Sequence, residues 1–375
     1  MPAIIVIGAG VIGTSVAYRL AKAGAKVTVL EATRVGGGTS GASFAWTNSN
    51  GKTPRPYHDL NVAGMRAHAA LKDEFGSIPW WHGGGRVEWR GEENQAALKD
   101  KVSRLQAWDY NAQWIAPSDL HELEPDIDLR TVGDEPIAYY PEDGWLDTIV
   151  YAHAMMSAAR KHGATLHCGV RVSQLALSGN KVTGVKTTAG ETYSADMVVN
   201  CTGRWSNEPL GKPELAIPLA PTVGFLVFTP PVPASISRVV ATPVCDFRPD
   251  GAGRLMIHWG PADATINPDL SAHPGMEEAR AIVKKLVEIL PGIGPVEPEA
   301  VRATIRPIPG DGLSAVGGIP DVDGYYLVVT HSGATLSPAL AHLVSDEIMN
   351  GNKRNELADF RPARFFANKS QRPVG

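Results

Sequence analysis

The residues with the clearest chemical pattern lie near the N-terminus, where three glycines follow a short apolar run. They are Gly8, Gly10 and Gly13, in the spacing Gly-x-Gly-x-x-Gly. In such a pattern the first glycine permits a tight turn and the second lets the backbone approach a pyrophosphate. The third lets a helix pack closely against the preceding strand. Glu31 follows where a carboxylate can bind an adenosine ribose. The pattern predicts a dinucleotide site; a purely structural βαβ unit is the alternative.

The elements around these glycines are in the order that such a site needs. Residues 4–7 are apolar and predict a buried parallel strand, and residues 12–23 carry apolar side chains at helical spacing. Residues 26–30 predict a second strand that delivers Glu31. A carboxylate there argues against a ribose that carries a 2′-phosphate. On this pattern alone the site suits NAD and FAD equally.

The composition excludes several other classes of protein. The chain has 375 residues, enough for two domains, and its 43% hydrophobic and 20% charged residues are typical of a soluble globular protein. A net charge of −4 gives no reason to expect nucleic acid or an anionic membrane as a partner. No apolar run reaches the roughly 18 residues of a membrane span, and the first strand leaves no room for a signal peptide.

The cysteines indicate a cellular compartment rather than a metal-binding site. Cys168, Cys201 and Cys245 are odd in number and lack the spacing of metal ligands. We therefore expect no metal and a cytoplasmic protein in which the three cysteines are small core residues.

Three later segments have the small residues expected beside a ligand. Residues 36–43 combine four glycines with Thr39, Ser40 and Ser43, whose hydroxyl and backbone groups suit a diphosphate; a flexible surface loop is the alternative. An apolar strand at 195–201 opens onto a small-residue turn, and a strand at 325–329 leads into residues 330–336. A last helix is expected to have Ser337 as N-cap and Pro338 as its first residue, and to end at Asn350-Gly351.

The remaining segments suggest a second, sheet-based domain. Residues 92–140 predict a polar helix over 93–108 and acidic turns, and residues 148–161 predict a helix. Strands between 170 and 193 form a meander, and residues 218–309 are largely β, with one helix over 276–290.

With these motifs in this order, the sequence resembles the glycine oxidase, D-amino-acid oxidase and sarcosine oxidase family of FAD flavoproteins. The matching pieces are the glycine fingerprint, the Gly-Gly-Gly-Thr-Ser-Gly-Ala-Ser loop, the Val-Val-Asn-Cys-Thr-Gly-Arg-Trp-Ser turn, Arg306-Pro307 with Asp311-Gly312, and His331-Ser332-Gly333.

The resemblance implies an α/β fold, α+β overall, with a Rossmann-like FAD-binding domain and an interleaved substrate domain that has a mixed β-sheet. The FAD-binding domain is expected at residues 1–80, 145–215 and 310–375, and the substrate domain at 81–144 and 216–309.

The resemblance also implies which residues bind FAD. The pyrophosphate would lie at the glycine fingerprint, the ribose at Glu31, the adenine at Val170 and the flavin's pyrimidine edge at the start of the last helix. The helix's positive end would stabilise the charge that reaches the flavin. The implied set is Gly8, Gly10, Val11, Ile12, Gly13, Glu31, Ala32, Thr39, Ser40, Ala42, Ser43, Phe44, Val170, Thr202, Gly203, Trp205, Arg306, Ser332, Gly333, Ala334, Thr335 and Leu336.

For the substrate, Arg306 aligns with the arginine that anchors the substrate carboxylate in glycine oxidase-like members. A guanidinium grips a carboxylate with two hydrogen bonds and so orients the α-carbon. The alternative is a structural arginine paired with Asp311. Arg302, on the same strand face, is either a second anchor or a surface charge. His258 falls near an oxygen-activating lysine of sarcosine oxidase-like members, and a packed core histidine is the alternative.

These features together predict an FAD-dependent enzyme that oxidises the C–N bond of a D-amino acid or an N-substituted amino acid. The electron acceptor would be oxygen, a quinone or a carrier protein. Members with covalent flavin have a cysteine near position 304 or a histidine in the N-terminal loop; Thr304 stands here, and residues 32–56 contain no histidine. The FAD is therefore expected to be non-covalent. Two alternatives are a nicotinamide-dependent dehydrogenase and a flavin-binding subunit of a larger complex.

Overall fold

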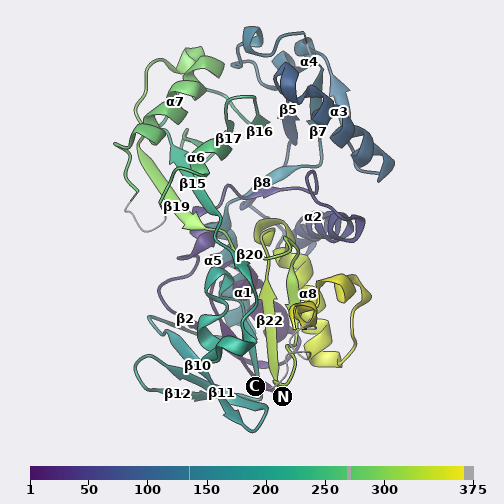
Figure 1. The fold of residues 1–375 in the computed structure, drawn as a ribbon, viewed down its shortest axis with the longest axis vertical. Helices are drawn as coiled ribbons and strands as arrows, with labels where there is room; N and C mark the ends of the chain where they lie inside the picture. Colours follow the sequence, from purple (N-terminus) through teal and green to yellow (C-terminus); the bar gives the residue numbers. More distant parts are fainter. Residues whose placement is uncertain (135, 268–271, 367–375) are drawn as a thin grey trace, which may run out of the picture.

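The computed structural model describes residues 1–134, 136–267 and 272–366. They form two lobes, each built on its own sheet, with both lobes visible along the long axis (Figure 1). Among these residues no helix is long and apolar enough to cross a membrane.

The lower lobe holds a six-stranded sheet that is parallel except at β21. Ile4 and Val6 of β1 pack toward the helices, whereas Ile5 and Ile7 pack toward a three-stranded meander. This alternation buries both sheet faces and explains why the strand is apolar throughout. In spatial order the strands are β21 (Ala315–Gly317), β22 (Tyr325–Val329), β13 (Met197–Asn200), β1 (Ala3–Ile7), β2 (Lys26–Glu31) and β9 (Thr165–Cys168).

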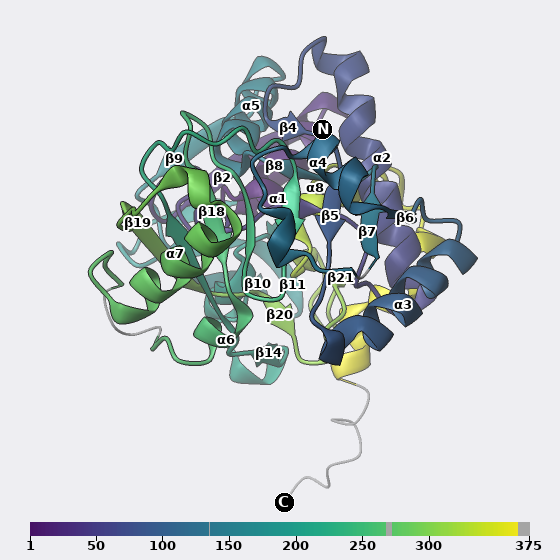
Figure 2. The same cartoon turned by 90° about the horizontal axis from the view of Figure 1, so that it is seen from above.

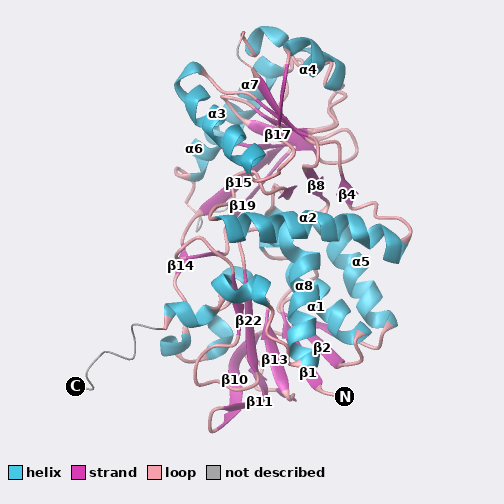
Figure 3. Cartoon of the chain, turned by 90° about the vertical axis from the view of Figure 1, so that its right-hand side faces the viewer, coloured by secondary structure: helices cyan, strands magenta, loops and turns pink. Residues whose placement is uncertain are grey.

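Three helices cover one face of this sheet, as Figure 3 shows. They are α1 (Val11–Lys22), α5 (Thr148–Lys161) and α8 (Gly333–Asn350). The opposite face carries the predicted meander, β10 (Val172–Ser178), β11 (Lys181–Thr187) and β12 (Thr192–Ser194). The cysteine prediction was wrong at Cys168, which is exposed on edge strand β9, although Cys201 and Cys245 are buried.

The upper lobe holds an eight-stranded mixed sheet with helices on both faces. Helices α7 (Glu277–Ile289) and α3 (Glu92–Ala107) lie on opposite sides of it (Figure 2), beside the shorter α4 (Pro117–Leu123) and α6 (Gly260–Asp263). In spatial order the strands are β19 (Ala300–Ile305), β15 (Val223–Phe228), β18 (Leu255–His258), β17 (Asp246–Pro249), β16 (Val239–Ala241), β5 (Arg86–Glu88), β7 (Ile137–Tyr140) and β6 (Gln113–Ile115).

Smaller elements join the lobes. Helix α2 (Arg55–Phe75) packs on α8, and one small sheet joins β3 (Trp46–Thr47), β8 (Gly144–Leu146) and β4 (Trp81–His82). A second pairs β14 (Leu219–Ala220) with β20 (Ile308–Pro309). Short 3-10 helices span Thr39–Ala42, Leu129–Thr131, Gly203–Trp205, Glu208–Leu210, Pro213–Leu215, Pro291–Ile293, Asn355–Phe360 and Pro362–Phe365.

The strands of the two large sheets fall on either side of the expected domain boundaries. All strands of the six-stranded sheet lie in residues 1–80, 145–215 and 310–375, and all strands of the eight-stranded sheet lie in 81–144 and 216–309. The division into two domains at these residues stays a prediction, and its last nine residues, 367–375, lie outside the described part of the chain.

The predicted start of the last helix was wrong. Helix α8 begins at Gly333, so Ser337 and Pro338 lie inside it. Pro338 has no N–H to donate to the carbonyl of Ala334, one turn earlier. His68 of α2 satisfies that carbonyl instead, with its Nε2 at 2.7 Å from the oxygen. Burial lowers the pKa of His68 to about 4, so the imidazole is neutral and donates from Nε2. A neighbouring helix therefore lets proline sit in this interior position.

Candidate functional site

A cavity of about 530 Å³ opens at the carboxyl ends of β1, β2, β13 and β22 and reaches the upper lobe. This size is ordinary for a ligand or cofactor pocket, and the ends of parallel strands are its usual location. Of the residues expected at a site, the structure brings these to the cavity wall: Gly8, Gly10, Val11, Ile12, Glu31, Ala32, Thr39, Ser40, Ala42, Ser43, Phe44, Val170, Thr202, Gly203, Trp205, His258, Arg306, Ser332, Gly333, Ala334 and Thr335.

Three expected site residues lie outside the cavity wall. Gly13 packs against Gly8 and Cys201, and the Leu336 side chain is fully buried in the core. The Arg302 guanidinium donates to the Gly41 carbonyl at 2.7 Å and lies over the Phe228 ring, so it does not join Arg306.

The glycines of the fingerprint stand where a side chain would meet neighbouring atoms. Gly8 has φ +97°, and a Cβ there would lie 2.8 Å from the Cys201 carbonyl oxygen. A Cβ on Gly13 would lie 1.9 Å from the Gly8 carbonyl oxygen, and one on Gly10 would lie 2.8 Å from Ser40 Oγ. The turn between β1 and α1 is therefore packed closely and exposes backbone to the cavity.

The carboxylate of Glu31 is held in place at the end of β2. It accepts hydrogen bonds from the N–H groups of Ala9 and Thr33, both at 2.8 Å, and from Thr33 Oγ1 at 3.0 Å. A carboxylate has about four acceptor positions, so one remains for a hydroxyl in the cavity. Val170 lies beside it, with its N–H donating to the Glu31 carbonyl at 2.9 Å.

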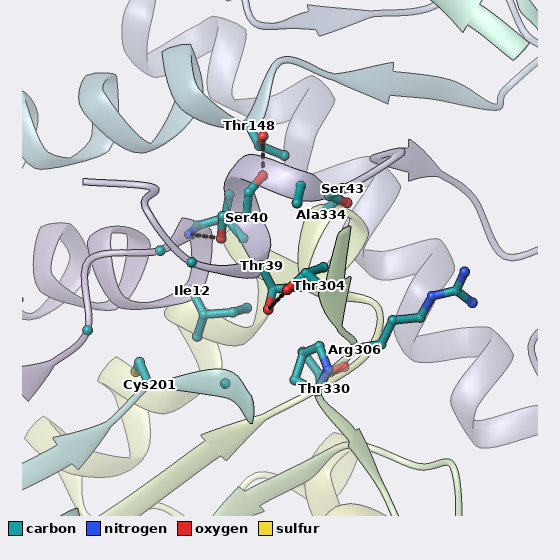
Figure 4. Close-up of a pocket in the computed structure, with 18 of the residues that line it drawn as sticks. Ile12, Thr39, Ser40, Ser43, Thr148, Cys201, Thr304, Arg306, Thr330 and Ala334 are labelled. Atoms are coloured by element: carbon teal, nitrogen blue, oxygen red, sulfur yellow. Dashed lines mark hydrogen bonds between the residues drawn. The ribbon is translucent and has the colours of Figure 1, made fainter. Parts of the chain in front are cut away.

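The predicted loop is an ordered 3-10 helix that connects both lobes. Ser40 Oγ accepts from the Val11 N–H at 3.1 Å, and its carbonyl accepts from Thr148 Oγ1 at 2.6 Å. Thr39 Oγ1 lies 3.4 Å from Thr304 Oγ1 of β19, across the site (Figure 4). These contacts hold residues 39 and 40 in place, so the alternative of a flexible surface loop was wrong.

The N-terminus of α8 faces the cavity with its first turn. Gly333, Ala334 and Thr335 line the wall, and the first N–H groups of a helix have no partner within it. They carry the positive end of the helix dipole and suit a negatively charged ligand edge. The N–H of Leu336 is already used, because it donates to the Ser332 carbonyl at 2.8 Å.

Arg306 follows β19, and Figure 4 shows its side chain extending away from the Thr39–Thr304 contact. Its guanidinium pairs with Asp263 of α6, whose carboxylate also lies 3.0 Å from His258 Nε2. The alternative prediction, an ion pair between Arg306 and Asp311, was wrong, because Asp311 pairs with Arg364 at 2.6 Å. The site therefore contains a coupled Arg306–Asp263–His258 group.

No role was predicted from the sequence for three charged or titratable side chains of the site, of which only His331 belongs to a quoted motif. Asp263 lies beside Arg306, and Lys52 and His331 line the cavity. Burial, with the positive charges of Lys52 and Arg306, lowers the pKa of His331 to about 3. No motif spacing points to Asp263 or Lys52, because Asp263 belongs to α6 and Lys52 to the loop after β3, which lie far apart in the sequence.

Comparison with known proteins decides the class. The profile described as "FAD dependent oxidoreductase", DAO, matches residues 3–347, which is most of the chain. The chain belongs to this family. It is an FAD-dependent oxidoreductase, as the resemblance predicted, and the DAO-type α/β fold is confirmed.

Individual relatives of this DAO-family enzyme cover nearly its full length. Glycine oxidase of Bacillus licheniformis is 26% identical over 361 residues, covering 94% of each chain. The glycine oxidase structure from Geobacillus kaustophilus superimposes with a TM-score of 0.84 at 23% identity, covering 97% of this chain and 98% of that one. The L-proline dehydrogenase structure from P. horikoshii gives 0.83 at 21% identity and covers 98% of both chains.

The cavity of this DAO-family enzyme fits the cofactor that the family requires. At the end of the cavity near Cys201, Gly8 and Gly10 expose backbone without side chains. Glu31 retains a free acceptor position there. The first turn of α8 and the Arg306 group lie along the same cavity. An elongated ligand with an anionic middle and a planar end suits this arrangement.

Proposed function

We propose that FAD lies along the cavity with its adenosine at Glu31 and its flavin at the start of α8. The pyrophosphate would meet the backbone of Gly8 to Gly13, with Thr39, Ser40 and Ser43 beside the ribityl chain. Val170 would contact adenine through its carbonyl, since its N–H is engaged. The N–H groups of Gly333 to Thr335 would face the pyrimidine edge, and that of Leu336 would not, because α8 uses it.

We propose that the enzyme oxidises the C–N bond of a small amino acid, either a D-amino acid or one with an N-substituent. Bound flavin supplies the chemistry by accepting a hydride from the carbon that bears nitrogen, and the resulting imine hydrolyses in water. Arg306 holds the substrate carboxylate, and α8 stabilises negative charge through its first N–H groups. Asp263 and His258 orient the guanidinium.

One observation carries this proposal: Arg306 and the first turn of α8 line the same cavity as the dinucleotide fingerprint. A carboxylate anchor is thereby joined to a site for a flavin. The name of the Bacillus licheniformis relative, glycine oxidase, supports a small amino acid as substrate.

An anaerobic screen of D-, L- and N-methyl amino acids tests the proposal. We expect the yellow absorbance of the bound flavin to disappear with at least one member of the D- or N-methyl sets, and to persist with NADH or NADPH alone. The proposal fails if no amino acid or amine bleaches the flavin. Bleaching that appears only when a second protein is added would favour the subunit alternative.

The attachment of the FAD gives a separate prediction. Thr304 lines the cavity at the position where some family members have a cysteine. We expect the flavin to be non-covalent, so acid precipitation should leave all yellow colour in the supernatant. Colour that remains in the washed precipitate would show a covalent bond.

The electron acceptor and the location stay predictions. Oxygen, a quinone or a carrier protein would reoxidise the enzyme, and peroxide production in air would identify oxygen. The cytoplasmic location is supported by the three cysteines, all free in the structure.

A further inference from the structure

Lys52 comes from the loop that follows β3, and this loop is firmly held. The N–H of Asn48 donates to Thr335 Oγ1 at 3.2 Å, and the N–H of Ser49 donates to the Tyr110 hydroxyl at 3.2 Å. Ser49 Oγ also lies 2.9 Å from His58 Nδ1. Residues 47–50 are buried, so the backbone that carries Lys52 has a defined position at the cavity.

Lys52 lines the cavity, and its ammonium group has no acidic partner among the described residues. Its Nζ lies 5.9 Å from the centre of the Tyr57 ring, and no carboxylate of the described chain forms an ion pair with it. Burial alone lowers the pKa of Lys52 to about 8, which leaves most molecules charged at neutral pH. A partly buried charge without an ion pair is costly, and a bound anion would offset this cost.

The other charged groups of the wall have partners in the structure. Arg306 pairs with Asp263, and Arg171 pairs with Glu208 at 3.2 Å. Glu31 accepts three hydrogen bonds.

Three further titratable side chains line the wall: Asp246, His258 and His331. Asp246 lies 3.9 Å from Arg90. His331 is neutral, and both Lys52 and Arg306 lie close enough to lower its pKa. Among the described residues of the wall, Lys52 is therefore a positive charge without an ion pair, in the cavity that Arg306 also lines.

We propose that Lys52 binds the substrate carboxylate together with Arg306 and so selects amino acids over amines that lack a carboxylate. The inference rests on the proposed function, because it assumes an amino acid as the substrate. Arg306 supplies directed hydrogen bonds, and Lys52 supplies the charge that Asp263 removes from the Arg306 group.

Binding of propionate and its neutral counterpart propionamide tests this role without turnover. Calorimetry on the flavin-loaded wild type should show tighter binding of propionate. Lys52→Met should raise the propionate Kd by roughly tenfold or more and leave the propionamide Kd unchanged. Lys52→Arg should restore most of the affinity. Lys72→Met, on the exposed side of α2, is the matched control and should bind both as the wild type does.

Two results would overturn the proposal. An unchanged propionate Kd in Lys52→Met would show that Arg306 acts alone. An equal loss for propionate and propionamide would show that Lys52 shapes the cavity rather than binding charge. Neither result depends on whether an amino acid bleaches the flavin, so failure of the proposed function is seen separately in the anaerobic screen.

If the variants do not fold, the pH dependence of the propionate Kd of the wild type tests the same proposal. Lys52 loses its charge as the pH rises through about 8, so the propionate Kd should rise between pH 7 and 9 while the propionamide Kd stays constant. Lys52 Nζ lies over the Tyr57 ring of α2, and Lys52 and Arg306 both lower the pKa of His331, which precedes α8. His331 is neutral throughout this range. A propionate Kd that is flat across this range would contradict the proposal.

Discussion

Gly13→Ala is expected to yield a protein that retains less than about a tenth of the wild-type flavin and unfolds at a lower temperature. The added Cβ would lie 1.9 Å from the Gly8 carbonyl oxygen and 3.3 Å from the Cys201 Cβ. Overpacking costs about 1–3 kcal/mol and more where backbone cannot move. Relief requires α1 to move away from β1, and this movement would displace the N–H groups that face the cavity.

The ratio of flavin to protein after purification measures this effect. Gly292→Ala is a matched control, because a Cβ there meets no atom within 4 Å. We expect the control to keep its flavin. Wild-type flavin content in Gly13→Ala would show that the fingerprint does not hold the cofactor in the way proposed here.

Arg306→Met is expected to lower kcat/KM for the best amino acid by roughly 30-fold to several thousand-fold. This range corresponds to the loss of about 2–5 kcal/mol when one partner of a buried charge pair is removed. The carboxylate would lose its directed hydrogen bonds, and Asp263 would keep its contacts with His258 Nε2 and with the Phe225 N–H.

Steady-state kinetics on the amino acid and on its carboxylate-free amine distinguish the loss of carboxylate binding from a general loss of active-site structure. The variant should lose activity with the amino acid and change little with the amine. Arg280→Met, an exposed arginine that pairs with Glu297, serves as the control for loss of a guanidinium. Equal activity of Arg306→Met and wild type on the amino acid would remove Arg306 from the site.

The sequence predicted those elements whose periodicity is strong and local. The helix at 148–161 and the strand at 325–329 match the structure to the residue, and the helix α3 differs by one residue at each end. The strands β6 and β7 in residues 92–140 were missed. Gln113 and Trp114 of β6 are exposed, so this edge strand has no alternating apolar pattern to find.

In the site, too, continuous sequence motifs were predictable, whereas residues brought together by the fold were not. Each cofactor segment is continuous in sequence, so its small residues were visible as a motif. Asp263 and Lys52 belong to no motif, and their importance depends on Arg306 and His331 lying nearby in the fold. The start of α8 was missed for a similar reason, because His68 lies on another helix.

Anaerobic mixing of the purified enzyme with the best amino acid, followed by product analysis, tests the central claim most directly. The account predicts that the bound flavin bleaches and that one carbonyl product, formed from the imine, appears for each flavin reduced. A flavin that stays yellow with every amino acid and amine, or that bleaches without any carbonyl product, would contradict it.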